Sequence, residues 1–153
     1  MDRSRFVVLK HTQPAGQIPV SRRQFLGGDD LSSDSLDVHF DLMLESEGGL
    51  LTWATTQPPS AKHPTLPAIQ LPLHRATYLQ YEGPVSDNRG TVQRVMSGTF
   101  SLIEIVPQMS LEDRFKILTI ELFPNDGDQP LRLILERMEQ DRFQLKCSVS
   151  SEA

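Results

Sequence analysis

A β-strand is predicted where the chain reads Val38-His39-Phe40-Asp41-Leu42-Met43-Leu44-Glu45. Apolar and polar residues alternate through this stretch except at its methionine, and successive side chains of a strand point to opposite faces. His39 and Asp41 therefore share one face, and the phenylalanine and the leucines share the other. An imidazole and a carboxylate two residues apart on a rigid strand can hold a divalent metal ion, or position an acid beside a bound anion.

The rest of the chain repeats this pattern of short strand-like segments divided by turn residues. Strands are predicted at residues 5–9, 36–45, 50–55, 69–73, 91–96, 99–106, 115–123, 131–136 and 142–148. A short helical turn is expected near Ser110, and residues 57–67, which hold four prolines, predict an irregular loop. The pattern predicts a mostly all-β protein, either a strongly curved sandwich or a small antiparallel β-barrel, with long loops and at most a short helix.

Length and composition predict a single domain over residues 1–153. One segment interrupts the strand pattern. Thr12–Ser35 is rich in glycine, proline, serine and acidic residues, which cannot supply a core. We therefore expect Thr12–Ser35 to be an inserted, mobile loop that protrudes from the barrel.

Charge and composition exclude several classes of protein. A net charge of −5 and a pI near 5.3 argue against a protein whose main task is to bind DNA or an acidic membrane. Cys147 is the only cysteine, so neither an internal disulfide nor a cysteine-based zinc site can form. The sequence shows no signal-peptide core and no membrane-spanning stretch, which predicts a cytoplasmic protein with no membrane partner.

Other histidines can join the His39–Asp41 pair from a distance. His11 follows the first predicted strand, and His74 follows the strand predicted at residues 69–73. His63, in the proline-rich loop, is expected to be solvated. Each histidine alone is more often a surface residue than a ligand, and a His-x-Asp pattern on a strand indicates a metal site in only roughly one case in ten.

Several short motifs, taken in their order along the chain, resemble one known family. They are Arg5–His11, His39–Glu45, Leu50–Ala54, Pro59-Ser60, His74 with Tyr78, Tyr81–Gly83, Gly90–Val92 and Gly98–Phe100. Together they resemble the phosphoesterase domain of ligase D, the bacterial end-joining DNA ligase. The resemblance spans almost the whole chain.

This resemblance implies a manganese-dependent enzyme of DNA repair that trims 3′ ends, removing a terminal ribonucleoside and then the 3′-phosphate. By resemblance, the metal ligands would be His11, Asp41 and His74. His39 would contact the scissile phosphate, and Tyr78 would line the catalytic site. Manganese is the expected metal, with zinc as the second choice. Two neutral imidazoles and one carboxylate leave a divalent ion with positive charge and open positions, which suits phosphate chemistry.

The chain differs from the family at the positions of the basic residues that contact the substrate phosphate. Met43 and Leu66 stand where the family has arginines, and Gln57 stands where it has a lysine. Such basic groups offset the charge of the transferred phosphoryl group, and losing one costs about 3 kcal/mol, or ~10²-fold in rate. We therefore expect 3′-phosphoesterase activity to be weak or absent unless other basic residues substitute.

Three arginines are candidates for this substitution: Arg75, Arg89 and Arg94. Arg75 follows His74 directly, so a regular strand would turn it to the opposite face.

Two classes of function remain open on the sequence. One is an active metal-dependent phosphoesterase with a rewired anion pocket, and the alternative is a catalytically inactive metal- or ligand-binding β-barrel. A structural barrel with no site is a third option. The expected partners are DNA or RNA 3′ ends, bound weakly because the chain is acidic, and a DNA-repair ligase acting in trans.

Limited proteolysis tests the predicted loop at Thr12–Ser35. Trypsin is expected to cut first after Arg22 or Arg23, because an exposed polar segment opens locally at low cost in free energy. Mass spectrometry of the earliest fragments identifies the cleavage sites. Early cleavage elsewhere, with both arginines protected, would contradict the prediction.

Overall fold

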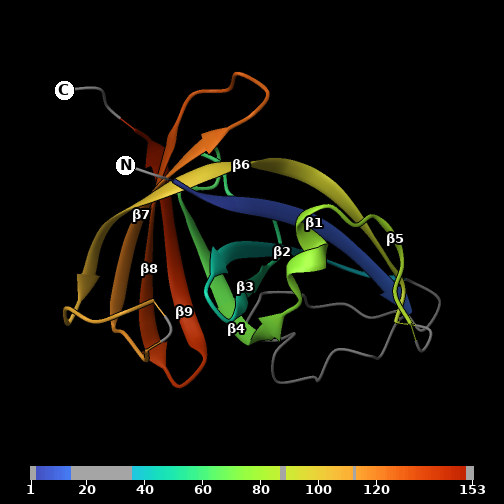
Figure 1. The fold of residues 1–153 in the computed structure, drawn as a ribbon, viewed down its shortest axis with the longest axis horizontal. Helices are drawn as coiled ribbons and strands as arrows, with labels where there is room; N and C mark the ends of the chain where they lie inside the picture. The colour runs from blue at the N-terminus through green and yellow to red at the C-terminus, as the bar shows by residue number, and fades with distance from the viewer. Residues whose placement is uncertain (1–2, 15–35, 87–88, 112, 151–153) are drawn as a thin grey trace.

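A computed structural model describes residues 3–14, 36–86, 89–111 and 113–150 (Figure 1). In these residues the chain forms strands and one short 3-10 helix, in the order β1 (Ser4–Pro14), β2 (Leu36–Ser46), β3 (Gly49–Thr55), β4 (Thr65–His74), η1 (Ala76–Leu79), β5 (Gly83–Pro84), β6 (Thr91–Val106), β7 (Ile117–Pro124), β8 (Leu131–Glu139) and β9 (Arg142–Val149). All pairings among the described strands are antiparallel. The prediction of a mostly all-β fold with at most a short helix is confirmed.

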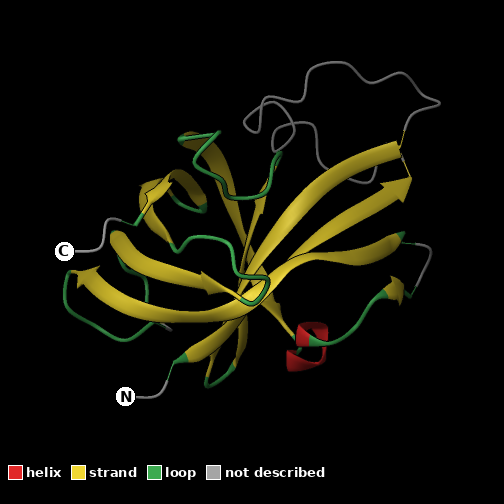
Figure 2. Ribbon diagram, turned by 90° about the horizontal axis from the view of Figure 1, so that it is seen from above, coloured by secondary structure: helices red, strands yellow, loops and turns green. Residues whose placement is uncertain are grey.

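The strands close into a ring. Their order in the sheet is β1-β2-β3-β4-β9-β8-β7-β6-β5, and an additional pairing of β1 with β6 closes it. The ring is uneven because β6 is long: its first part pairs with β1 and its second part with β7. The strongly curved strands cross one another in the view from above, with η1 to one side (Figure 2).

Both faces of β1 are buried. Phe6, Val7, Val8 and Leu9 are each at most 1% exposed. Phe6 and Val8 belong to the main core, together with Trp53. Val7 and Leu9 belong to a second core, which consists of Val7, Leu9, Met43, Leu50, Leu79 and Val92. Because strand side chains alternate, this second core must lie on the outer face of β1 and β2, where η1 contributes Leu79 to it.

The strand alternation predicted in β2 is confirmed. Leu42 and Leu44 are fully buried in the main core, and Phe40 packs against it. Met43 is 1% exposed and belongs to the second core on the other face. Met43 shares a strand face with His39 and Asp41, and it is apolar because this part of the outer face packs in the second core.

The strands predicted at residues 91–96 and 99–106 are one continuous strand, β6, and the prediction of a break was wrong. Gly98 lies opposite Phe6 of β1 and Pro124 of β7. A Cβ atom there would lie 2.1 Å from the carbonyl oxygen of Phe123. The glycine is needed for a close approach of neighbouring backbones and does not end the strand.

One further boundary differs from prediction. The loop expected at residues 57–67 is shorter, since β4 starts at Thr65 and its Leu66 pairs with Leu145 of β9. At the helical turn expected near Ser110, the described residues form a single turn, in which the backbone N–H of Asp113 donates to the carbonyl oxygen of Ser110 at 3.1 Å. The Asp113 carboxylate accepts hydrogen bonds from the backbone N–H and the hydroxyl of Ser110, as in a capping box.

The predicted loop at Thr12–Ser35 is described only at its start. Thr12–Pro14 extends β1 and pairs with residues 36–38 of β2, so these residues are strand and not loop. The remaining residues, 15–35, lie outside the described part of the chain. Among the described residues, no helix has the length and apolarity needed to cross a membrane.

Replacement of Gly98 by alanine tests the close approach at β6. The added methyl group would collide with backbone, so we expect Gly98→Ala to lower the free energy of unfolding by about 1–3 kcal/mol. Urea denaturation followed by circular dichroism measures the change. Gly48→Ala is the control, because its Cβ would meet only Leu73 Cδ1 at an ordinary 3.7 Å. Equal stabilities of the two variants would refute the interpretation.

Candidate metal site

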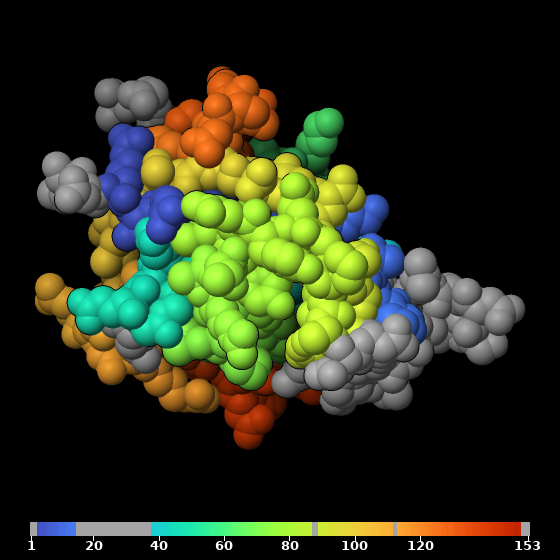
Figure 3. Space-filling view, turned by 45° about the vertical axis from the view of Figure 1, so that its right-hand side comes forward, coloured from blue at the N-terminus to red at the C-terminus, as the bar shows by residue number. Residues whose placement is uncertain are grey.

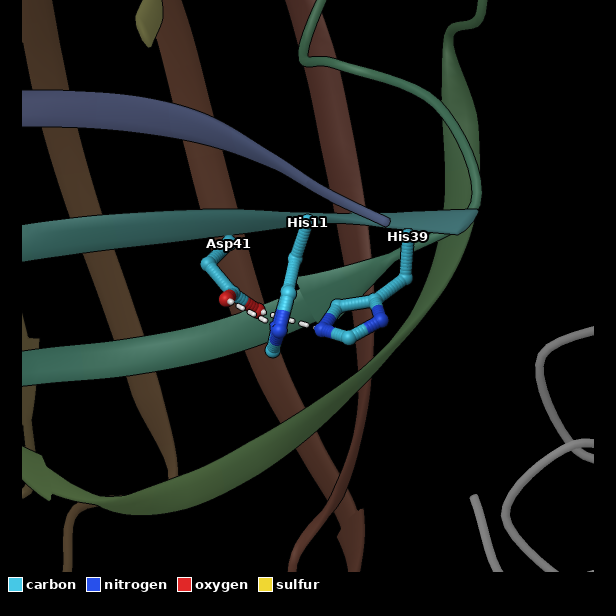
Figure 4. Close-up of side chains that lie close together, drawn as sticks. All are labelled: His11, His39 and Asp41. Carbon is cyan, nitrogen blue, oxygen red and sulfur yellow. Dashed lines mark ion pairs between the residues drawn. The ribbon is translucent and has the colours of Figure 1, made fainter. Parts of the chain in front are cut away.

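Three side chains gather where the outer face of β1 and β2 turns from apolar to polar. His11 of β1 lies directly opposite His39 of β2, and Asp41 lies opposite Leu9. His11 continues the outer face of Val7 and Leu9, because the three residues are two apart along β1. The side chains of His11, His39 and Asp41 point toward one another from the two strands (Figure 4).

The distances among these groups suit a shared ligand. His39 Nε2 lies 3.1 Å from Asp41 Oδ1, and His11 Nδ1 lies 3.8 Å from Asp41 Oδ2. The two imidazole rings are edge to face, with centroids 4.8 Å apart. The predicted common face of His39 and Asp41 is therefore confirmed.

One ligand atom from each of the three residues can be chosen so that all lie within 4.8 Å of one another. Two atoms bound to the same ion at ~2.1 Å can be at most about 4.2 Å apart. Small side-chain rotations therefore bring the group to coordination distance. His11, His39 and Asp41 can hold a metal ion.

Burial favours the ligand form of His11. Burial lowers its pKa below the ordinary 6.5, and the neighbouring His39 and His74 act in the same direction. The Arg89 carbonyl and Asp41 oppose this shift but do not outweigh it. His11 is therefore neutral at pH 7, with a lone pair on one ring nitrogen.

A backbone contact decides which nitrogen of His11 has the lone pair. His11 Nε2 lies 2.7 Å from the carbonyl oxygen of Arg89. A carbonyl oxygen only accepts hydrogen bonds, so Nε2 must carry the proton and Nδ1 the lone pair. This lone pair lies 3.8 Å from Asp41 Oδ2, and Asp41 is 2% exposed. A half-buried and a buried acceptor near each other favour a cation between them, and a carbonyl partner on the far nitrogen is typical of metal-bound histidines.

A cleft of about 670 Å³ opens beside this group. Its walls come from β1, β2, the end of β4, η1 and the segment that leads into β6, with lining residues that include His11, Asp41, Met43, His74, Arg75, Tyr78, Tyr81, Ser86 and Arg89. In the space-filling view, the yellow-green segment that follows β4 covers this side of the barrel (Figure 3). The cleft therefore lies on the outer surface of the ring, beneath the segment that the second core holds in place.

His74 and Tyr78, two of the residues expected at the site, line this same cleft. Their rings are edge to face with centroids 5.7 Å apart. His74 Nδ1 lies 2.9 Å from the carbonyl oxygen of Pro72, so neutral His74 has its lone pair on Nε2. The structure thus brings His11, Asp41, His74 and Tyr78 around one space. It groups His39, and not His74, with His11 and Asp41.

The three replaced basic positions are not equivalent in the structure. Met43 lines the cleft, whereas Gln57 and Leu66 do not. Gln57 is exposed in the β3–β4 loop, and Leu66 is buried in β4. Of the three positions, Met43 alone belongs to the described lining of the cleft.

Two of the three candidate arginines, Arg75 and Arg89, line the cleft, and Arg94 does not. The expectation that Arg75 turns to the face opposite His74 holds only for a regular strand, and it does not apply here because β4 ends at His74. Ser86, which anchors the Arg89 side chain, was missed by sequence reasoning. The only sequence feature that could have indicated this role is that Ser86 is a hydroxyl residue a few positions before Arg89.

No protein-family model matches the chain, and no curated protein matches its sequence. Membership of the ligase D phosphoesterase family therefore stays a prediction.

Measurements of metal affinity can decide whether His39 or His74 is the third ligand beside His11 and Asp41. We expect His39→Ala to weaken Mn²⁺ binding at least ~10-fold, since loss of even an outer partner of a ligand has this effect, while His74→Ala changes it less. Isothermal titration calorimetry measures both affinities. His63→Ala, in the exposed β3–β4 loop, is the control. If His74→Ala loses Mn²⁺ affinity and His39→Ala retains it, the ligand set is instead His11, Asp41 and His74.

Proposed function

We propose that this protein is a divalent-metal-dependent phosphoesterase that acts on nucleic-acid 3′ ends, of the ligase D phosphoesterase type and with a diverged phosphate pocket. The main support is the pairing of His11 and Asp41. The Arg89 carbonyl fixes the proton of His11 on Nε2 and leaves Nδ1 as an acceptor 3.8 Å from Asp41 Oδ2. This arrangement, at the edge of a cleft that also contains a histidine and two tyrosines, suits a metal-assisted reaction.

The mixed set of imidazole and carboxylate ligands suits Mn²⁺ first and Zn²⁺ second. A bound ion of this kind supplies a Lewis acid for a phosphoryl oxygen and lowers the pKa of a bound water. His11, His39 and Asp41 would hold it. All three lie on two paired strands, and His39 and Asp41 are buried, which restricts side-chain movement, so little reorganisation is needed.

The remaining polar residues of the cleft would contact the substrate. The Tyr78 hydroxyl can donate a hydrogen bond to a phosphoryl oxygen. His74, with its proton held on Nδ1 by the Pro72 carbonyl, leaves Nε2 as a proton acceptor. If His74 is the ligand instead, His39 is the residue that remains for the phosphate, as the resemblance implies.

The second candidate function is a metal- or ligand-binding barrel without turnover. One observation favours it: Met43, at the position of a family arginine, is packed in the second core and cannot offset phosphate charge. The net charge of −5 also weakens attraction of nucleic acid at long range. In either case the partners that we propose are DNA or RNA 3′ ends, bound weakly, and a DNA-repair ligase in trans, in the cytoplasm.

An assay on a 3′-phosphorylated primer-template with Mn²⁺ tests the function. We expect slow release of phosphate, about 10²-fold below a family enzyme that has the arginine at the position of Met43, because one charged contact with the transition state is missing. Asp41→Ala should abolish the release. Asp128→Ala, on an exposed turn outside the cleft, is the matched control and should leave it unchanged.

Absence of turnover together with Mn²⁺ binding that depends on Asp41 would support the binding module. Turnover that survives Asp41→Ala would refute both forms of the proposal.

A further inference from the structure

Arg89 lies in the wall of the cleft next to the candidate metal group. Its carbonyl oxygen accepts the hydrogen bond from His11 Nε2 at 2.7 Å. The next residue, Gly90, has a φ of 93°, and a Cβ there would lie 1.9 Å from the carbonyl oxygen of Thr12. Only glycine allows the chain to lie so close to β1. The backbone of Arg89 is therefore held against the strand that carries His11.

The guanidinium of Arg89 is also held in place. Its Nε donates to the carbonyl oxygen of Ser86 at 2.9 Å, and its Nη2 donates to the Ser86 hydroxyl at 3.0 Å. Ser86 lines the same cleft. These bonds use two of the five guanidinium N–H donors. No carboxylate in the described part of the chain forms an ion pair with Arg89, so this side chain keeps donors and charge for a ligand.

The cleft is positive although the protein is acidic. Arg75 and Arg89 line it, and Asp41 is the only carboxylate among its described lining residues. With neutral histidines the lining has a formal charge of +1, whereas the chain has a net charge of −5. A divalent ion held by the metal group would raise the local charge further. This is the environment of an anion site.

We propose that Arg89 is the anion-binding residue of this cleft and that its ligand is a phosphate monoester. That the anion is a phosphate monoester rests on the proposed function. That Arg89 binds it rests on the cleft alone. Arg89 adds positive charge to the cleft that Met43 also lines, but from a different position than the family arginine. A planar guanidinium binds two phosphate oxygens at once, and its two bonds to Ser86 reduce the entropy lost on binding. Arg75, exposed at the end of β4, is a second positive group at the rim.

Titration of inorganic phosphate, followed by isothermal titration calorimetry, tests the inference. It is done first on the metal-free protein and then on the protein loaded with Mn²⁺. We expect Arg89→Gln to weaken phosphate binding at least ~10-fold in both states, since a charge-assisted hydrogen bond contributes that much. Arg89→Lys, which keeps the charge but loses the planar fork, should lie between Arg89→Gln and the wild type.

The control is Arg94→Gln. Arg94 is exposed and lies outside the cleft lining, and its hydrogen bond to Glu82 uses the backbone N–H, which the variant retains. Arg89→Gln also retains the backbone carbonyl that contacts His11. Its Mn²⁺ affinity and melting temperature are measured beside those of the control, so that a loss of phosphate binding can be separated from a loss of metal or of folding.

The outcomes separate the inference from the proposed function. Phosphate binding that falls in Arg89→Gln but not in Arg94→Gln supports the inference, even if the protein binds no Mn²⁺ and the proposed function fails. Equal phosphate affinities of the two variants overturn it, even if Mn²⁺ binds and the enzyme turns over. Absence of phosphate binding by the wild-type protein in both states also overturns it.

A second ligand identifies the source of the phosphate. A 3′-phosphorylated oligonucleotide that binds more tightly than inorganic phosphate, with the same loss in Arg89→Gln, supports a nucleic-acid end as the ligand. Equal affinity for both, again lost in Arg89→Gln, supports a small phosphate monoester.

Discussion

The burial of both faces of β1 is the constraint on which the rest of the structure depends. A barrel strand needs only one apolar face, yet Val7 and Leu9 on the outer face are as buried as Phe6 and Val8 on the inner one. Each such apolar side chain contributes roughly 1.5–3 kcal/mol when buried. The second core therefore has enough apolar surface to hold η1 and the segment after it against the ring, and this covering layer turns a flat sheet face into a cleft.

The candidate site is the polar continuation of that outer face. His11 follows Val7 and Leu9 at two-residue steps, and Asp41 precedes Met43 in the same way. The register that buries the apolar residues thus also sets His11 opposite His39. A slip of one residue would turn all of these side chains to the other face, including the histidines. Core packing and site geometry therefore depend on the same strand pairing, and a change in one disturbs the other.

Local patterns predicted the parts of the site that lie within one strand, and long-range contacts made the rest unpredictable. The shared face of His39 and Asp41 follows from alternation alone. The contact of His11 with the Arg89 carbonyl joins residues 78 positions apart and depends on the close approach at Gly90. The continuity of β6 through Gly98 depends on Phe123 of another strand. Arg75 lines the cleft because β4 ends one residue before it, and strand ends are the least predictable boundaries.

The acidic chain and its positive cleft differ in charge, so the net charge does not describe the environment that a ligand in the cleft would meet. Charges separated by more than about 8 Å are largely screened at physiological salt. The acidic residues that make the chain negative are, except for Asp41, absent from the described cleft lining. A ligand in the cleft therefore experiences Arg89, Arg75 and the metal group more strongly than the rest of the surface. Long-range repulsion slows the approach of an anion, but the groups that contact it determine whether it stays bound.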